Sequence, residues 1–271
     1  MVVFNRTTIQ SLDMSIPMAR TALDPVVSEI GYLADIVGRD KTGMSSRSER
    51  IKRIFDVIFA GAALLILSPV IMMVAVFIRL ESSGSVFFQQ ERIGLNRRKN
   101  DRRRYVPDGY DGTDRRRNDD RRKEIHAGKP FNIYKLRTMR VDAEKAGPTL
   151  SCKGDSRITK IGQLLRRTRI DEIPQFINVI KGEMSIVGPR PERSYFISQV
   201  RQDVPEFPLR LKVKPGITGL AQVEDGYTDT VEKMTGKLYY DLKYISQLSI
   251  PQEISILFKT VFVVISGKGA C

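Results

Sequence analysis

The sequence predicts an α+β protein that is predominantly helical and monotopic, meaning that it enters a membrane from one face only. Two helical patterns of apolar residues lie in the second half of the chain, and a 22-residue run without a charged side chain lies in the first. A short alternation of apolar and polar residues between them predicts a small β element. We divide the chain into a tail (1–49), a re-entrant membrane helix (50–80) and a cytoplasmic domain (81–271) that a basic insert interrupts at about 96–128.

The composition indicates an anionic partner and argues against two kinds of active site. Lysine and arginine number 45 against 31 acidic residues, and the net charge of +14 suits phosphates, nucleic acid or an acidic membrane surface. His126 is the single histidine, and Cys152 and Cys271 have no metal-ligand spacing. A zinc site and a Ser-His-Asp triad are therefore not expected. The two thiols fit a reducing compartment.

The tail carries few signals. Residues 1–49 contain no basic start followed by an apolar core, so we predict no signal peptide. Leu23 to Val37 has the pattern of an amphipathic helix, and Lys41 to Arg50 has the polar composition of a linker. We expect the tail to be flexible and assign it no function.

The uncharged run extends from Val57 to Ile78, which as a helix would measure about 33 Å and could cross a bilayer. Ser68-Pro69 lies at its middle, where proline removes a backbone hydrogen bond and kinks a helix. Basic residues flank the run on both sides, and positive charge is retained on the cytoplasmic side. We therefore predict a kinked helix that enters and leaves through one leaflet, with the Ser68 hydroxyl satisfying a backbone group freed at the kink.

Asp56 lies at the entry to this run. A charged side chain there is costly unless it is paired or lies near the lipid headgroups. We expect Lys52 or Arg53 to be its partner.

The basic insert is rich in charge and poor in apolar residues. Residues 97–123 carry twelve Lys or Arg and six Asp, which predicts a solvated surface loop. Binding to anionic lipid headgroups is a second interpretation. Nucleic acid is disfavoured because Tyr105 and Tyr110 are the only rings available for stacking. An Arg-x-x-Asp pattern, as at Arg98–Asp101 and Arg117–Asp120, leaves a regulatory nucleotide open.

The stretch from Ile158 to Pro191 concentrates the residues that we expect to be functional. Its two apolar helical patterns comprise Ile158, Ile161, Leu164 and Leu165, then Ile173, Phe176, Ile177 and Ile180. An arginine-rich turn between them ends at Asp171-Glu172, and Pro174 is tolerated in the first turn of the second helix. The two carboxylates thus lie at a helix N-terminus, where the helix dipole favours negative charge. Helix capping is the simplest role for them, and the surrounding cations favour a reactive centre.

Two other segments add charged or polar groups. The alternation from Pro130 to Met139 predicts a strand with Lys135 and Arg137 on one face, although a solvated face would have the same pattern. The Pro/Gly-rich sequence from Lys214 to Gly219 predicts a turn whose amides could hold an anion.

The C-terminal region supplies a further carboxylate and an apolar helix. Asp241 lies among tyrosines, and Ile254 to Phe262 forms one apolar helix face with Lys259 beside it. That face could belong to the core or lie on the membrane interface, and we assign it to the interface.

Taken together, the motifs resemble the bacterial sugar transferase family, the monotopic polyprenyl-phosphate phosphoglycosyl transferases, and within it the exopolysaccharide branch. The resemblance covers about residues 50–271 outside the insert. The matching segments are KRIFD (Lys52–Asp56), Ser68-Pro69, FFQQERIG (Phe87–Gly94), FNIYKLRTM (Phe131–Met139), RRTRIDEIPQFINVIKGEMSIVGPRPE (Arg166–Glu192), KPGITGLAQV (Lys214–Val223) and YYDLKYI (Tyr239–Ile245). The insert is longer than the family's usual turn, and Arg169-Ile170 replaces a small residue and a leucine before the dyad.

The resemblance implies an enzyme that transfers a sugar 1-phosphate from a UDP-sugar to undecaprenyl phosphate and releases UMP, at the cytoplasmic face of the bacterial inner membrane. It makes Asp171 the nucleophile, with Glu172 beside it, and an ionised carboxylate can attack phosphorus if cations offset the repulsion. The expected phosphate-binding residues are Lys135, Arg137, Arg166 and Arg190. The expected substrate-site loops contain Pro189, Pro191, Gly216, Thr218 and Gln222. Glu172 and Asp241 are the expected ligands of Mg²⁺, which prefers hard oxygen donors.

A protein of another class remains as the alternative: a membrane-anchored binder of anions or nucleic acid, or a scaffold, that uses the arginine-rich insert. An intact Asp171-Glu172 pair argues against it. The transferred sugar, a homo-oligomer and the glycan pathway are left open by the sequence.

Overall fold

The protein is described by a computed structural model that covers residues 17–39, 44–96, 128–143, 149, 154–225 and 231–266. The basic insert and the first part of the tail lie outside these residues, so the predictions made for them stay predictions. The expected amphipathic helix is present as α1 (Pro17–Gly38), which packs on α7 (Val231–Ser246). Ile30, Leu33 and Val37 are buried in the main core, so this part of the tail is folded rather than flexible.

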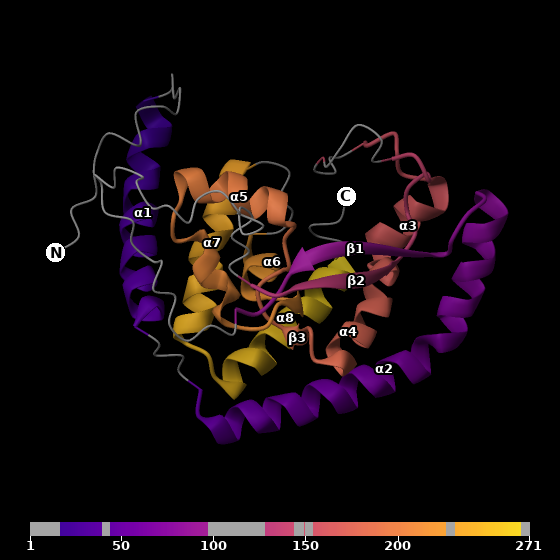
Figure 1. The fold of residues 1–271 in the computed structure, drawn as a ribbon, viewed down its shortest axis with the longest axis horizontal. Coiled ribbons are helices and arrows are strands. Elements are labelled where there is room, and N and C mark those ends of the chain that lie inside the picture. The colour runs from indigo at the N-terminus through magenta and orange to yellow at the C-terminus, as the bar shows by residue number, and fades with distance from the viewer. Residues whose placement is uncertain are drawn as a thin grey trace, which may run out of the picture.

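The long helix α2 (Ser46–Glu81) contains the predicted membrane run. Its N-cap is Ser45, whose side chain accepts a hydrogen bond from the amide of Ser48. Pro69 lies inside it and cannot donate to the carbonyl of Leu65, and the hydroxyl of Ser68 donates to that oxygen at 2.8 Å instead. The helix continues through this point, and its ribbon changes direction along its length (Figure 1).

Most of α2 is not covered by the rest of the protein. Within the described part of the chain it is the one helix long and apolar enough to cross a membrane, and few residues of its apolar segment are buried. Large side chains such as Leu65, Ile66 and Met72 are exposed. Exposed apolar surface on this scale marks an interaction with a membrane or a partner. The structure therefore supports membrane association through α2.

Three charged residues at the start of α2 dock it on the folded body. Asp56 is buried and accepts hydrogen bonds from the hydroxyl of Ser185 at 2.8 Å and the amide of Ile186 at 3.2 Å. Arg53 donates to the carbonyls of residues 179 and 180 at 2.6 and 2.9 Å, and Lys52 pairs with Glu253. The expected pairing of Asp56 with Lys52 or Arg53 is therefore wrong. Asp56 binds residues 185 and 186, Arg53 binds residues 179 and 180, and Lys52 binds Glu253 and the carbonyl of residue 187.

In the described ranges, the β structure consists of two separate two-stranded sheets. Strand β1 (Phe87–Ile93) pairs antiparallel with β2 (Pro130–Leu136), in a register that places Phe88 opposite Lys135. Strand β3 (Ser185–Val187) pairs parallel with β4 (Gly216–Thr218). The predicted turn from Lys214 to Gly219 thus contains a buried strand, and its amide at Gly216 donates to the carbonyl of Pro189 at 2.9 Å rather than facing an anion.

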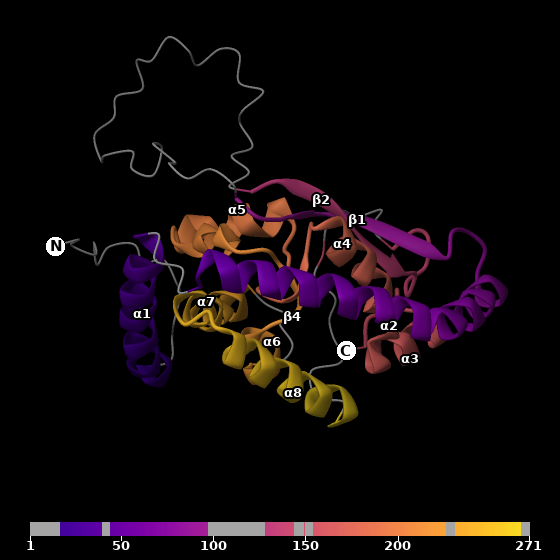
Figure 2. The same cartoon turned by 90° about the horizontal axis from the view of Figure 1, so that it is seen from below.

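The remaining elements are helices around these sheets. They are α3 (Lys160–Thr168), the 3₁₀ segment η3 (Ile170–Gln175), α4 (Phe176–Lys181), α5 (Ser194–Asp203), the 3₁₀ segment η4 (Phe207–Lys212), α6 (Leu220–Glu224) and α8 (Ile250–Ser266). Figures 1 and 2 show α1, α7 and α5 at one end of the molecule and α3 with the far end of α2 at the other. The main core lies among α7, β3, α5 and η4, and a smaller apolar cluster joins the second half of α2 to β2 and α3.

The C-terminal helix α8 has one buried and one open side. Ile256 is buried in the core, whereas Phe258, Phe262 and Ile265 are exposed. The apolar face predicted from the sequence is therefore mostly uncovered by the protein itself.

Candidate functional site

Asp171 and Glu172 lie in the first turn of η3, as the sequence predicted. Arg169 ends α3 and begins η3 with φ 56° and ψ 17°, the one non-glycine residue with positive φ in the described chain. This left-handed residue reverses the chain between the two helical segments. It turns both carboxylates inward, so that Asp171 is 5% and Glu172 7% exposed.

Glu172 is held by two cations from different elements. Lys135 of β2 donates to its Oε1 at 2.9 Å, and Arg190 donates to the same oxygen at 2.6 Å and to Oε2 at 3.5 Å. Burial alone would raise the pKa of Glu172, but Arg190 and Lys135 outweigh it and hold the pKa well below its ordinary value. Glu172 is therefore a fixed, ionised residue that keeps both cations beside Asp171.

Asp171 is surrounded by charge but is not engaged. Within the described ranges its carboxylate has no hydrogen-bond or ion-pair partner, in contrast to Glu172. Burial raises its pKa to about 6, opposed by Lys135, while Glu172 raises it further and Arg166 and Arg190 lower it. At neutral pH Asp171 is thus a mostly ionised carboxylate with free oxygens, the state that a nucleophile requires.

Two of the predicted phosphate-binding residues, Arg166 and Arg137, differ in their contacts: Arg166 lies beside the dyad and Arg137 does not. Arg166 donates from Nε to the hydroxyl of Thr138 at 2.9 Å and lowers the pKa of Asp171, so it belongs to the site. The buried Arg137 donates to the carbonyls of Ser82 and Ser83 at 2.7 and 2.8 Å and to the Ser82 hydroxyl. Arg137 fixes the end of α2, so it is not in the cation shell of the dyad where the sequence had placed it.

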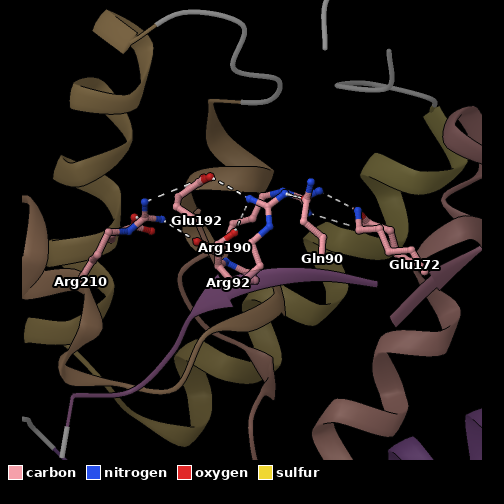
Figure 3. A network of polar contacts seen from close by, with 9 residues as sticks. Gln90, Arg92, Glu172, Arg190, Glu192 and Arg210 are labelled. Atoms are coloured by element: carbon pink, nitrogen blue, oxygen red, sulfur yellow. Dashed lines mark hydrogen bonds and ion pairs between the residues drawn. The ribbon is translucent and has the colours of Figure 1, made fainter. Parts of the chain in front are cut away.

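The loop from Pro189 to Pro191 connects the dyad to a second polar cluster, drawn in Figure 3. Arg92 of β1 donates to the Pro191 carbonyl at 3.2 Å and to Glu192 at 3.4 Å. On the other side, Arg210 of η4 donates to the Arg190 carbonyl at 2.9 Å and pairs with Asp241 at 2.8 Å. The loop is therefore held by arginines from both sides.

The second cluster contains two groups with shifted pKa values on one face of α7. Burial raises the pKa of Asp241 to about 6, although Arg210 opposes the shift. Burial also lowers the pKa of Lys237, one turn earlier, to about 8, although Glu192 opposes that shift. Lys237, Arg210 and Arg92 were not singled out from the sequence, because no local pattern indicates that they converge on the 189–191 loop.

The other predicted loop residues are structural neighbours of that loop. A Cβ on Gly216 would lie 2.1 Å from the amide nitrogen of Gly188, so glycine is required for the close approach of β4. Thr218 shares a hydrogen bond of 2.7 Å with Thr260, and Gln222 donates to the Ile217 carbonyl at 3.0 Å. Pro189, Pro191 and Arg190 line a small pocket together with Arg210. The residues that line the pocket thus include the 189–191 loop and none of 216–222.

The predicted Mg²⁺ ligands can be tested against these contacts. In the part of the chain that the structure describes, no group of three or more acidic, histidine or cysteine residues could hold a metal ion. Mg²⁺ is commonly bound by one or two carboxylates together with substrate phosphates and water. Asp171 can supply such a carboxylate because its oxygens are free, whereas both oxygens of Glu172, the predicted ligand, accept hydrogen bonds from Lys135 and Arg190. Asp241 does not fit it, because its carboxylate is 2% exposed and faces Arg210 and Lys237.

A buried Asp-Glu pair in a shell of cations, joined to a long exposed apolar helix, defines a membrane-associated protein with a buried centre of carboxylates and cations. The chain belongs to the bacterial sugar transferase family, whose profile matches residues 47–105 and 120–267.

Named relatives share a large part of the chain. A UDP-glucose:undecaprenyl-phosphate glucose-1-phosphate transferase of Escherichia coli K12 is 38% identical over 231 residues, which are 84% of this chain and 43% of the relative. A UDP-N-acetylgalactosamine-undecaprenyl-phosphate N-acetylgalactosaminephosphotransferase of Aeromonas hydrophila is 36% identical over 81% of this chain and 45% of its own. The exopolysaccharide production protein PSS of Rhizobium leguminosarum bv. phaseoli is 35% identical over 81% of this chain and 98% of its own. The chain therefore spans less than half the length of the first two relatives.

Proposed function

We propose that this protein transfers a sugar 1-phosphate from a UDP-sugar to undecaprenyl phosphate, yielding undecaprenyl-diphosphate-sugar and UMP. The observation that carries the proposal is the difference between two adjacent buried carboxylates. Glu172 is bound by Lys135 and Arg190, whereas Asp171 is ionised and has free oxygens. The names of the relatives supply the substrate class.

The reaction proceeds in two displacements at one phosphorus atom. A carboxylate oxygen of Asp171 attacks the phosphorus that carries the sugar, and the bond to the bridging oxygen breaks, so that UMP leaves with the electron pair. The product is a phosphoglycosyl-aspartate. An oxygen of undecaprenyl phosphate then attacks the same phosphorus and expels the Asp171 carboxylate. Each step exchanges one P–O bond for another, so no oxidant or proton donor is required.

The cations around the dyad make the first step feasible. A carboxylate and a diphosphate repel each other, and preorganised positive charge offsets that repulsion as charge develops. Lys135, Arg166 and Arg190 provide it, and Glu172 fixes two of them in place. Mg²⁺ bound at the dyad with the substrate phosphates would add Lewis-acid stabilisation of the transferred group.

The membrane arrangement follows from α2 and α8. In this proposal α2 is re-entrant: it bends at Ser68-Pro69, and both of its ends lie at the cytoplasmic face of the inner membrane. The exposed apolar face of α8 lies in the headgroup region beside it. Arg53 and Asp56 tie the start of α2 to α4 and β3. These contacts support the proposal that the dyad lies near the level of the lipid phosphate. Cysteine labelling from each side, at Arg47→Cys and at Ser83→Cys, would give same-side accessibility, and opposite-side labelling would rule the arrangement out.

The reaction is tested with membrane-embedded protein, Mg²⁺, undecaprenyl phosphate and a panel of UDP-sugars. We expect UMP release with one or a few donors, and its loss in Asp171→Ala. Asp203→Ala, at an exposed position of α5, is the matched control and should retain full activity. Folded protein that releases no UMP from any donor would contradict the proposed donor class and favour an anion-binding protein without turnover.

A further inference from the structure

Asp241 is a buried carboxylate that lies outside the dyad. It projects from α7 and is 2% exposed, and its ion pair is formed with Arg210 of η4 at 2.8 Å. Arg210 is itself 3% exposed and lies over the ring of Phe207, 4.8 Å from its centroid. Two charges that are removed from water this completely have to compensate each other.

Arg210 also contacts the loop that carries Arg190. The same guanidinium nitrogen that pairs with Asp241 donates to the main-chain carbonyl of Arg190 at 2.9 Å. The side chain of Arg190 extends from this point in the other direction and binds Glu172 at 2.6 Å. Asp241, Arg210, Arg190 and Glu172 therefore form one continuous chain of contacts from α7 to the dyad, part of which is visible in Figure 3.

We propose that Asp241 and Arg210 are positioning residues: their ion pair fixes the backbone of Arg190 and so holds the Arg190 guanidinium on Glu172. The inference rests on the function proposed above and corrects the expectation that Asp241 is a Mg²⁺ ligand. Asp241 acts through Arg210 and does not touch the reacting phosphates.

The surroundings of Asp241 support a positioning role over metal binding. Mg²⁺ retains several water molecules and requires room for an octahedral shell. Asp241 is enclosed and faces Arg210, and Lys237 lies one turn away on the same helix. A divalent cation at Asp241 would have to displace Arg210 from its ion pair and would lie beside Lys237.

The first test compares Asp241→Asn, Arg210→Lys and the control Asp203→Asn in the full chain in membranes. Amide hydrogen exchange at Arg190 and Glu192, the two residues of the 189–192 loop that are not proline, requires no activity, so it tests this inference even if the proposed reaction is wrong. We expect faster exchange of this loop in both cluster variants and no change in the control. Arg210→Lys keeps the charge that compensates Asp241 but lacks the planar fork of arginine, so it separates positioning from loss of folding.

The second test uses turnover and Mg²⁺. For Asp241→Asn we expect kcat/KM to fall by about tenfold to a hundredfold, as expected for a misplaced catalytic group, with an unchanged Mg²⁺ concentration for half-maximal rate. In an Arg190→Ala background the same substitution should lower kcat/KM by less than about a further threefold, because the residues act as one unit. A large rise in the Mg²⁺ requirement with unchanged loop exchange would identify Asp241 as a metal ligand and overturn the inference.

Discussion

Replacing Lys135 by methionine should move the acid limb of the pH–rate profile to higher pH. Lys135 contacts Glu172 at 2.9 Å. It is also the cation that most strongly opposes the rise in the pKa of Asp171 caused by burial. Burial holds the pKa of Asp171 at about 6, above its usual range, so the reactive carboxylate is lost as the pH falls through that value. Without Lys135, burial is less opposed and the pKa rises further.

The magnitude follows from the geometry. A nearby opposite charge lowers a carboxyl pKa by about 1–3 units, and the partial exposure of Lys135 favours the lower end of that range. A shift of about one unit reduces the ionised fraction of Asp171 at pH 6 from about one half to about one tenth. The ratio of rates between pH 8.5 and pH 6 should then increase from about twofold to about tenfold. Loss of phosphate binding would lower the rate at every pH and leave this ratio unchanged.

The assay is single-turnover UMP formation between pH 5 and pH 9 with protein in lipid nanodiscs. Lys129→Met, at an exposed position just before β2, is the control and should keep the wild-type limb. An unchanged limb in Lys135→Met, or a shift to lower pH, would refute the assignment of the acid limb to Asp171.

Two further predictions concern stability. Asp56→Ala should lower the free energy of unfolding by about 2–3 kcal/mol, because it leaves the buried amide of Ile186 and the Ser185 hydroxyl without their acceptor. Thermal melts in detergent would measure the loss. An unchanged Tm would show that α2 docks without Asp56. Gly216→Ala should destabilise by about 1–3 kcal/mol or prevent folding, because its Cβ would meet the backbone of Gly188, whereas Gly236→Ala on α7 has open space and should be neutral or stabilising. Equal melting temperatures for the two glycine variants would contradict the tight β3–β4 packing.

The features that could be predicted from the sequence are those set by local pattern. The uncharged run predicted α2, and the position of Ser68 before Pro69 predicted its hydrogen bond to the freed carbonyl of Leu65. Helical periodicity and the dyad's position predicted that Asp171 and Glu172 begin a helical segment. These predictions depend on residues within one or two helical turns of each other.

The features that were missed depend on contacts between distant segments. Gly216 lies in a buried strand because β3 supplies a partner some thirty residues earlier, and the same glycine in isolation indicates a turn. Asp241 was expected at the metal, but Arg210 of η4 reaches it. Arg137 is of the residue type that binds phosphate, but its guanidinium donates to main-chain carbonyls at the end of α2. Residue type indicated that charge would gather near the dyad, and only the tertiary fold determined which charges reach it.

The covalent intermediate on Asp171 is the most direct test of the account. Protein in nanodiscs without undecaprenyl phosphate is mixed with the donor UDP-sugar and Mg²⁺, quenched and analysed by mass spectrometry after digestion. We predict UMP in amounts equal to the protein, a sugar-phosphate mass added to the peptide that contains Asp171, and removal of that mass when undecaprenyl phosphate is supplied. Full turnover with acceptor, together with no adduct and no UMP in its absence, would contradict nucleophilic attack by Asp171.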